Sequence, residues 1–383
     1  MTTAVVGGAL ANKAGYGGEA WIRMSWVLGL RRLGVDAWLV EDLESTTCVD
    51  CRGAPASASD SYNLAYFNEV VTTFGLADRA ILRVDGGAQI FGAGPGTMAA
   101  LRDQTDLVVN IGGHLPAEEL FPRARRVYVD IDPGWTQFWH MSGNPGARLE
   151  GHHAFYTIAE NLGASGCPIP TAGLSWRTIR QPVVLDDWPV TAGPGPGRFT
   201  TVATWRNPFG PVDDEPNGAK HHQFRRFVEL AQGSPAVYEI ALRIDKGDAA
   251  DERLLAAKGW RVVDATKVAR TPADFQAYVQ ASSAEFSPTQ GIYAQTSSGW
   301  FSDRSLRYLA SGRPVLVQDT GLDRLYPIGK GLVTFDSLDE ARDGAERIGR
   351  DYSSHAAAAR AIAEQFFDSD VVLGRLLDET GIS

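Results

Sequence analysis

The chain has 383 residues, of which 44% are hydrophobic and 21% are charged, and its formal net charge is −10. This length exceeds one typical hydrophobic core and favours two domains, while the ordinary composition argues against long disordered regions. The acidic balance argues against a nucleic-acid partner, because arginine and lysine are scattered among acids. It still leaves room for a local basic pocket that takes one diphosphate.

Targeting and cysteine signals favour the cytosol. The first strand-like run begins at Ala4, which leaves no room for the basic region and apolar core of a signal peptide. No apolar stretch approaches the length that spans a bilayer, so we expect no membrane span. Cys48 and Cys51 form a C-x-x-C pair, but no second pair completes a zinc site, and we interpret them as two unrelated loop thiols. We therefore expect a cytoplasmic protein.

Short apolar runs alternate with helical stretches through residues 1–165, as in an α/β domain. Residues 19–33 predict a helix, because Ile22, Trp26 and Leu30 recur at helical spacing and Gly34 supplies a stop signal. Nearly continuous apolar strands are typical of a parallel sheet that is covered on both faces. The predicted strands are residues 4–6, 37–40, 80–84, 107–111 and 126–131.

Residues 166–198 interrupt this rhythm. They are rich in proline and glycine and have no clear period, which predicts a stiff interdomain crossing. The strand–helix rhythm restarts over residues 199–365, and a terminal helix over 366–383 is a candidate for packing back on the first domain. We therefore predict two Rossmann-like, doubly wound parallel-sheet domains that face each other across a cleft. In the second domain the predicted strands are 199–204, 236–242, 260–263, 284–286, 314–318 and 332–335, and the predicted helices are 223–230, 249–258, 272–280, 305–311 and 338–349.

The densest motif lies in residues 291–321, where a polar, glycine-bearing loop leads into a helix that Ser302 or Asp303 caps. A helix start with free N–H groups and several hydroxyls suits a phosphate, and Arg304 adds a cation there. An ordinary strand–helix–strand crossover is the alternative, but it would need none of these polar groups. The predicted donor-binding residues are Ser298, Gly299, Ser302, Asp303, Arg304 and Ser305.

The run from Phe301 to Val315, with its Leu-Ala-Ser-Gly-Arg-Pro-Val segment, resembles the donor-site motif of GT-B glycosyltransferases. It is most similar to the retaining branch that includes sucrose and glycogen synthases, and the whole chain resembles a bacterial glycosyltransferase-like subgroup. The resemblance implies a nucleotide-diphospho-sugar donor, most readily a UDP-sugar, with no metal and no cofactor. That branch has two glutamates where this chain has Gly299 and Arg307, which leaves Asp303 as a candidate for the ribose contact.

The resemblance also implies an arginine and a lysine that neutralise the departing diphosphate. The matching candidates are Arg206, after the first strand of the second half, and Lys220. A solvated basic patch is the alternative. His114 follows a predicted strand in the first half and is the third catalytic candidate, since a histidine near such a strand end contacts the donor sugar in the resembled branch. A structural histidine is the alternative here.

The acceptor side is expected in the first half. A glycine-rich loop lets a backbone approach a ligand closely, and it precedes the first helix. Asp130-Ile131-Asp132 spells the D-x-D of metal-dependent glycosyltransferases of a single domain, which the two-domain architecture argues against, so Asp132 is assigned to the acceptor side instead. The predicted acceptor-side residues are Gly15, Tyr16, Gly17, Gly18, Asp132 and Trp135.

Residues 91–96 and the two histidine pairs are not interpreted as binding sites. Residues 91–96 resemble a dinucleotide fingerprint but do not follow the first strand of a βαβ unit, so we predict a turn. The pairs His152-His153 and His221-His222 lack the spacing of metal ligands, because adjacent side chains on a helix point apart.

Together these patterns predict an enzyme that moves a hexose-type sugar from a nucleotide-diphospho-sugar to a small-molecule acceptor, with a natural product or a nucleoside as candidates. Retention fits the resembled branch, whereas inversion would need a general base, for which His114 and Asp132 are the candidates. A sugar-nucleotide epimerase of the same fold and a non-catalytic sugar-binding protein are the alternatives. The oligomeric state is left open.

Overall fold

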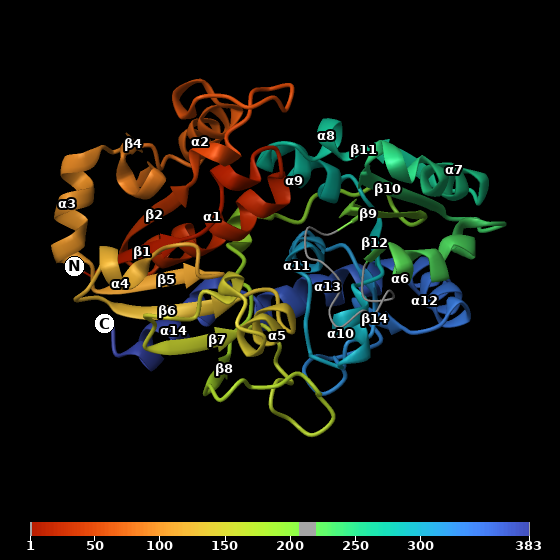
Figure 1. Cartoon of the computed structure of the whole chain (residues 1–383). Coiled ribbons are helices and arrows are strands. Elements are labelled where there is room, and N and C mark those ends of the chain that lie inside the picture. The colour runs from red at the N-terminus through yellow and green to blue at the C-terminus, as the bar shows by residue number, and fades with distance from the viewer. Residues whose placement is uncertain (1, 207–219, 383) are drawn as a thin grey trace.

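The computed structural model describes residues 2–206 and 220–382 and contains two β-sheets, one in each half of the chain (Figure 1). Eight strands form the first sheet, in the order β4-β3-β2-β1-β5-β6-β7-β8. All neighbours in it are parallel except β3 and β4. Its strands are β1 (Thr3–Gly7), β2 (Asp36–Leu43), β3 (Ala80–Val84), β4 (Gln89–Gly92), β5 (Leu107–Ile111), β6 (Arg125–Asp130), β7 (Ala154–Thr157) and β8 (Trp176–Thr178).

Six parallel strands form the second sheet, in the order β11-β10-β9-β12-β13-β14. They are β9 (Arg198–Thr204), β10 (Val237–Arg243), β11 (Arg261–Asp264), β12 (Ala284–Ser287), β13 (Val315–Gln318) and β14 (Leu332–Phe335). The predicted α/β class with two parallel sheets is confirmed. Strands β3, β5, β12 and β13 are buried along their whole length, as expected for parallel strands between two layers of helices.

Helices join the parallel strands in both halves. The first half contains α1 (Gly17–Arg32), α2 (Tyr62–Thr73), α3 (Pro95–Gln104), α4 (Ala117–Leu120) and α5 (Trp135–Met141). The second contains α6 (Lys220–Arg226), α7 (Ala249–Ala257), α8 (Ala265–Val268), α9 (Pro272–Gln280), α10 (Gly291–Gln295), α11 (Asp303–Ala310), α12 (Leu338–Arg350) and α13 (Tyr352–Phe366), and α14 (Ser369–Thr380) follows. Within the described ranges, no helix is long and apolar enough to cross a membrane.

Both sheets have the same strand order relative to the chain. In the first sheet the order reverses at β1, which lies between β2 and β5, and in the second at β9, which lies between β10 and β12. Ligands of open α/β sheets bind beyond the carboxyl ends of the strands at such a reversal. The fold therefore points to two crevices, one after β1 and β5 and the other after β9 and β12.

The proline-rich segment does more than cross between the halves. It supplies the edge strand β8, which pairs with β7, and Val183 then exchanges backbone hydrogen bonds with Phe367 and Ser369 at the end of α13. From there α14 runs back beside the first sheet (Figure 1), where Leu373 and Leu376 join the core that contains Trp26 of α1.

An apolar cluster joins the two halves directly. The ring centroids of Trp21, in α1, and Trp188 are 4.8 Å apart. Those of Trp188 and Phe275, in α9, are 6.2 Å apart. The indole N–H of Trp21 donates to the carbonyl of Pro272 at 2.9 Å. Helices α1 and α9 therefore form a packed contact between the two halves.

Most predicted elements are found, with shifts at their ends. The helix predicted over 19–33 is α1. The turn predicted over 91–96 is wrong, because residues 91 and 92 end β4, residues 95 and 96 begin α3, and only two residues lie between them. The helix predicted over 223–230 is instead α6, followed by a 3-10 turn at Val228–Ala231. Strands β4, β7 and β8 were not predicted, and each has at most four residues.

Candidate active site

The crevice of the second sheet is built on the start of α11. Ser302 caps this helix, its Oγ accepting the N–H of Arg304 at 3.3 Å. Ser305 in the first turn and Thr289 after β12 are buried, and neither hydroxyl has a partner among the residues that the structure describes. Both line a cavity of about 10 Å³ together with Gln318 and Thr320, which is room for one water. The two unengaged hydroxyls beside the helix N-terminus therefore suit a buried water.

A residue from the first half holds the loop before α11 in place. The side-chain amide of Asn161 donates to the carbonyls of Ser297 and Gly321 at 2.9 Å each, and its backbone N–H donates to the carbonyl of Ser298 at 3.0 Å. Gly299 has a positive φ of 74°, and a Cβ there would lie 2.9 Å from the Asn161 nitrogen. This close approach explains why position 299 carries no glutamate, unlike the resembled branch.

The second glutamate position of that branch is also used differently. Arg307 is 1% exposed and donates to the carbonyls of Trp21 and Pro182 and to the hydroxyl of Ser25. Burial lowers the pKa of Arg307 to about 10, so it remains charged at neutral pH. Arg307 thus ties α11 to α1, and Asp303, which is half-buried at the start of α11, remains the acidic group at this helix end.

Arg304 points into the carboxyl end of the second sheet. Its guanidinium donates to Glu285, to the carbonyl of Val202 at 2.8 Å and to the Oγ of Ser287 at 2.6 Å. Glu285 is fully buried, so the pair places one positive and one negative charge together. The cation expected at this helix start is present, but a carboxylate offsets its charge.

Lys220, the first residue of α6, is a cation with no such partner. Across the described ranges, no hydrogen bond or ion pair engages its ammonium group. Burial and then the charge of Arg304 lower its pKa to about 8, against the opposing charges of Asp303, Glu285 and Glu19. These neighbours place Lys220 between the start of α11 and the first half, still protonated at pH 7.

Arg206 has different surroundings from Lys220, with which it was expected to act. Two of its nitrogens donate to the carboxylate of Asp248 at 2.6 Å each, and its side chain is 54% exposed. The charges that act on it are those of Asp248, Asp251 and Asp245. Its guanidinium is thus already neutralised, which the sequence did not indicate because Asp248 lies 42 residues away. The insert 207–219 lies outside the described residues.

The crevice of the first sheet is shaped by the turn after β5. The Asn110 side chain accepts the N–H of Leu115 at 3.0 Å and donates to its carbonyl at 2.9 Å, which closes the turn that carries His114. Gly112 and Gly113 both have positive φ, 66° and 68°, as this turn requires. A Cβ on Gly7 of β1 would lie 2.6 Å from Leu115. Gly7 at the end of β1, together with Gly112 and Gly113 after β5, therefore allows the turn that carries His114 to pack over β1.

His114 is a hydrogen-bond donor in this arrangement. Arg148, which can only donate, lies 2.7 Å from its Nδ1, so Nδ1 accepts and Nε2 carries the proton. Burial and then the charges of Arg148, Arg23 and Lys13 lower the pKa of His114 to about 3. A neutral imidazole without a free lone pair does not act as a general base, so only Asp132 keeps that role among the two candidates.

Asp132 follows β6 and faces the second half. Burial, then the charges of Asp130 and Glu19, raise its pKa to about 7, and the hydroxyl of Tyr293 lies 3.5 Å away. Asp130 itself is saturated, since Thr136, Gln137, Thr157 and the Asp132 N–H all donate to it. The expected acceptor-side residue Trp135 is 3% exposed and packs on Ile292 and Tyr293 of the second half.

The glycine-rich loop also packs on the second half. The N–H of Gly17 donates to the carbonyl of Ala269 at 3.0 Å, and a Cβ on Gly17 would lie 2.1 Å from the carbonyl oxygen of Thr271. Arg243 stacks on the ring of Tyr16 at 3.7 Å and donates to the carbonyl of Gly15 at 2.8 Å, while Gly18 lies against the ring of Phe275. The loop is therefore a contact between the two halves.

Sequence reasoning missed three charged residues in this crevice. Arg23 is 2% exposed and pairs with Glu19, one helical turn earlier in α1. Burial alone would raise the pKa of Glu19, but the charges of Arg23 and Lys13 lower it below its usual value. The only sequence signal was the i,i+4 spacing of Glu19 and Arg23, which is common on exposed helices.

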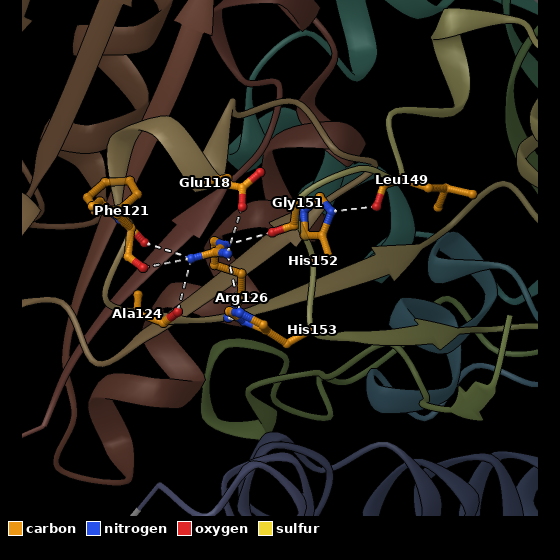
Figure 2. Close-up of polar contacts among 9 residues, drawn as sticks. Glu118, Phe121, Ala124, Arg126, Leu149, Gly151, His152 and His153 are labelled. Carbon is orange, nitrogen blue, oxygen red and sulfur yellow. Dashed lines mark hydrogen bonds and ion pairs between the residues drawn. The ribbon is translucent and has the colours of Figure 1, made fainter.

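The histidine pair 152–153 is structural. The imidazole of His152 lies 3.1 Å from the carbonyl of Leu149 and 3.0 Å from the side-chain amide of Asn110. His153 accepts the N–H of Arg126, whose buried guanidinium ties Gly151 to the segment before β6 (Figure 2). No group of three or more histidine, cysteine, aspartate or glutamate residues with the geometry to hold a metal ion occurs in the described part of the chain.

Comparisons with known proteins establish the fold. No protein-family model matches the chain, and no curated protein matches it. Among solved structures, an alpha-glucosyltransferase in complex with UDP and a 13-mer DNA superposes with a TM-score of 0.61 at 10% identity over 100% of both chains. HepE of Anabaena, in complex with UDP and glucose, superposes with a TM-score of 0.58 at 12% identity over 100% of both chains. Sucrose-phosphate synthase of Thermosynechococcus elongatus superposes with a TM-score of 0.55 at 10% identity over 99% of both chains. The chain has the GT-B fold of these glycosyltransferases, as the donor-site motif predicted.

Proposed function

We propose that this chain is a glycosyltransferase that moves a hexose-type sugar from a nucleotide-diphospho-sugar, most readily a UDP-sugar, to a small-molecule acceptor without a metal ion. The observation that carries the proposal is the capped start of α11 at the strand reversal of the second sheet, with Lys220 near enough for its charge to interact with those of Asp303 and Arg304 in the first turn. The Lys220 ammonium group, which has no hydrogen-bond partner among the described residues, and the capped start of α11 are the groups that would hold the diphosphate. Structural neighbours of the same fold were solved with UDP or UDP-glucose.

The diphosphate would lie between the start of α11 and Lys220. Negative charge grows on the leaving diphosphate as the glycosidic bond breaks, and preorganised N–H groups and cations stabilise it there. Lys220 supplies a full charge, whereas Arg304 shares its charge with Glu285. Arg206 would join this site only by leaving Asp248. Charge stabilisation therefore falls mainly to Lys220 and the N–H groups of Ser302–Ser305 in this proposal.

The acceptor would enter against the first sheet. His114 offers its Nε2–H as a donor to a sugar hydroxyl, and Asp132 is the group placed to take a proton from an acceptor hydroxyl, since its pKa of about 7 lies near neutral pH. One neighbour was solved with DNA, but the net charge of −10 favours a small molecule over a polyanion for this chain.

A donor screen tests the proposal. Thermal unfolding is measured with each common nucleoside diphosphate, and we expect UDP to raise the melting temperature because a ligand that binds only the folded state stabilises it. Turnover of UDP-glucose is then followed by product analysis. Release of UDP with a glycosylated product supports a transferase, whereas an isomerised donor sugar indicates the epimerase. A protein that no nucleoside diphosphate stabilises contradicts the proposal.

A further inference from the structure

We propose that Asn161 is a positioning residue that sets the affinity of the second crevice for the phosphate groups of the donor, through the loop before α11. The inference rests on the proposed function, because it concerns the same diphosphate site. The place of Asn161 in the fold carries it: the residue follows β7 in the first half, yet its side-chain amide donates to two backbone carbonyls of the second half.

The Asn161 amide joins two loops at the carboxyl edge of the second sheet. The loop before α11 contributes the carbonyl of Ser297, and the turn after β13 contributes the carbonyl of Gly321, both at 2.9 Å. These loops also bond to each other, since the N–H of Gly299 donates to the carbonyl of Thr320 at 2.7 Å. A carboxamide has two N–H donors on one nitrogen, so a single side chain serves both loops.

The loop before α11 needs this support, because part of its backbone is strained. Ser297 has a φ of 45°, in the left-handed region that residues with a Cβ rarely adopt. Asn161 also fits closely, since a Cβ on Gly321 would lie 2.8 Å from its amide nitrogen and one on Gly299 would lie 2.9 Å from its backbone nitrogen. Without the amide, we expect Ser297 to relax to a common conformation and the backbone that leads to Ser302, the cap of α11, to shift with it.

The segment that carries Asn161 is itself held in place. The side chain of the preceding residue, Glu160, is 11% exposed and accepts hydrogen bonds from two nitrogens of Arg180 at 3.0 and 2.9 Å. The hydroxyl of Tyr326, in the second half, donates to the same carboxylate. The carbonyl of Asn161 accepts the N–H of Ala164 at 2.9 Å, which closes a turn. Because these contacts fix the segment, the amide can impose a position on the loop before α11.

The consequence for the donor depends on its phosphates. In the proposed site the N–H groups of Ser302–Ser305 receive the diphosphate, and the loop that Asn161 holds leads directly into them. A loop that is not held must be ordered when the diphosphate binds, and this ordering lowers affinity. The nucleoside part of the donor is not assigned to these N–H groups, so its binding should not depend on Asn161.

Titrations of the full chain with UDP and uridine test the inference, because the two probes differ by the diphosphate. Asn161→Ala should weaken UDP binding by about tenfold, the scale of two hydrogen bonds of modest net strength, and should leave uridine affinity within about twofold. Asn161→Asp keeps the size of the side chain, but a carboxylate cannot donate to either carbonyl, so it should show the same loss for UDP. Calorimetry measures UDP binding, and a ligand-observed NMR titration measures uridine binding.

The matched control is Glu69→Gln, which weakens another contact between the halves, the exposed ion pair with Arg270 at 3.3 Å. It should leave both affinities unchanged. Asn161 is only half-buried, so its replacement leaves no buried cavity, and retained uridine binding shows that each variant is folded. The inference is overturned if UDP affinity is unchanged in both Asn161 variants, if uridine binding weakens as much as UDP binding, or if Glu69→Gln produces an equal loss. A wild-type protein that does not bind UDP would instead contradict the proposed function.

Discussion

The two crevices share one topology and differ in what lines them. Each lies beyond a strand reversal, at β1 and β5 in the first sheet and at β9 and β12 in the second. The second crevice presents the start of α11 and hydroxyls, with Arg304 turned inward to Glu285. The first presents charged side chains, Arg23 and Lys13, and a neutral histidine. A repeated fold therefore supplies two strand-reversal edges, and our proposal assigns the donor to the second and the acceptor to the first.

The largest expected effect comes from removing the Lys220 ammonium group of the second crevice. Lys220→Ala should lower kcat by roughly 10²-fold with a smaller change in KM, because the diphosphate charge grows in the transition state. The pKa of about 8 also predicts that kcat falls as pH rises through 8, since the ammonium group then loses its proton. Lys220→Arg should move this limb to higher pH. Steady-state kinetics from pH 6 to 10 measure both effects.

Arg206→Ala is the matched control for that variant. Its guanidinium is more than half exposed and held by Asp248, so we expect kcat within about threefold of the wild-type value, below 1 kcal/mol in barrier height. A loss of kcat as large as that of Lys220→Ala would show that Arg206 leaves Asp248 when the donor binds. Charge stabilisation would then belong to both residues.

The contact between the crevices can be broken at Gly17. A Cβ there would overlap backbone atoms of Thr271, so Gly17→Ala should lower the free energy of unfolding by about 1–3 kcal/mol. Gly349→Ala in α12 is the control, because nothing lies within 4 Å of its added Cβ. Urea unfolding of both variants provides the measurement. If the two variants have equal free energies of unfolding, the close contact between Gly17 and Thr271 does not contribute to stability.

The charge state of the first crevice makes stability depend on pH. The pKa of His114 is about 3 in the folded chain, below its ordinary value of 6.5. Below pH 6.5 the unfolded chain binds a proton that the folded chain does not, so the wild-type free energy of unfolding falls as pH falls toward 3. The His114→Gln variant has no imidazole at this position, so its free energy of unfolding should not fall for this reason. Chemical unfolding at pH 7.5 and 5 should show the wild type losing stability relative to the variant, and a pH-independent difference would exclude the buried neutral histidine.

The smallest effect is expected from a chelator. Turnover should be unchanged in excess EDTA, because the groups proposed to stabilise charge are N–H groups and Lys220. Loss of turnover that manganese restores would return Asp130 and Asp132 to consideration as metal ligands.

Sequence patterns predicted the local structure at the start of α11 better than the contacts between distant segments around Gly8. The start of α11 was predicted from local signals, a glycine-bearing loop, a cap and hydroxyls within one short segment. Arg23 belongs to the first crevice only because α1 packs over Gly8, a contact between distant segments that no local pattern reveals. The partners of Arg206 and Arg304 were missed for the same reason, since Asp248 and Glu285 lie 42 and 19 residues away.

Strand boundaries show the same limit. Buried strands such as β3 and β5 were predicted at the residues where they occur, because both faces are covered and the apolar run is continuous. The edge strand β8 has three partly or fully exposed residues, so its sequence resembles a loop and only pairing with β7 makes it a strand.

A crystal structure with UDP tests the division of labour between the two crevices most directly. The account predicts that the diphosphate lies at the start of α11, within hydrogen-bond reach of the N–H groups of Ser302–Ser305 and of the Lys220 ammonium group, with Arg23 still paired with Glu19. A nucleotide bound wholly against residues 1–160, with its diphosphate on Arg23, would contradict it.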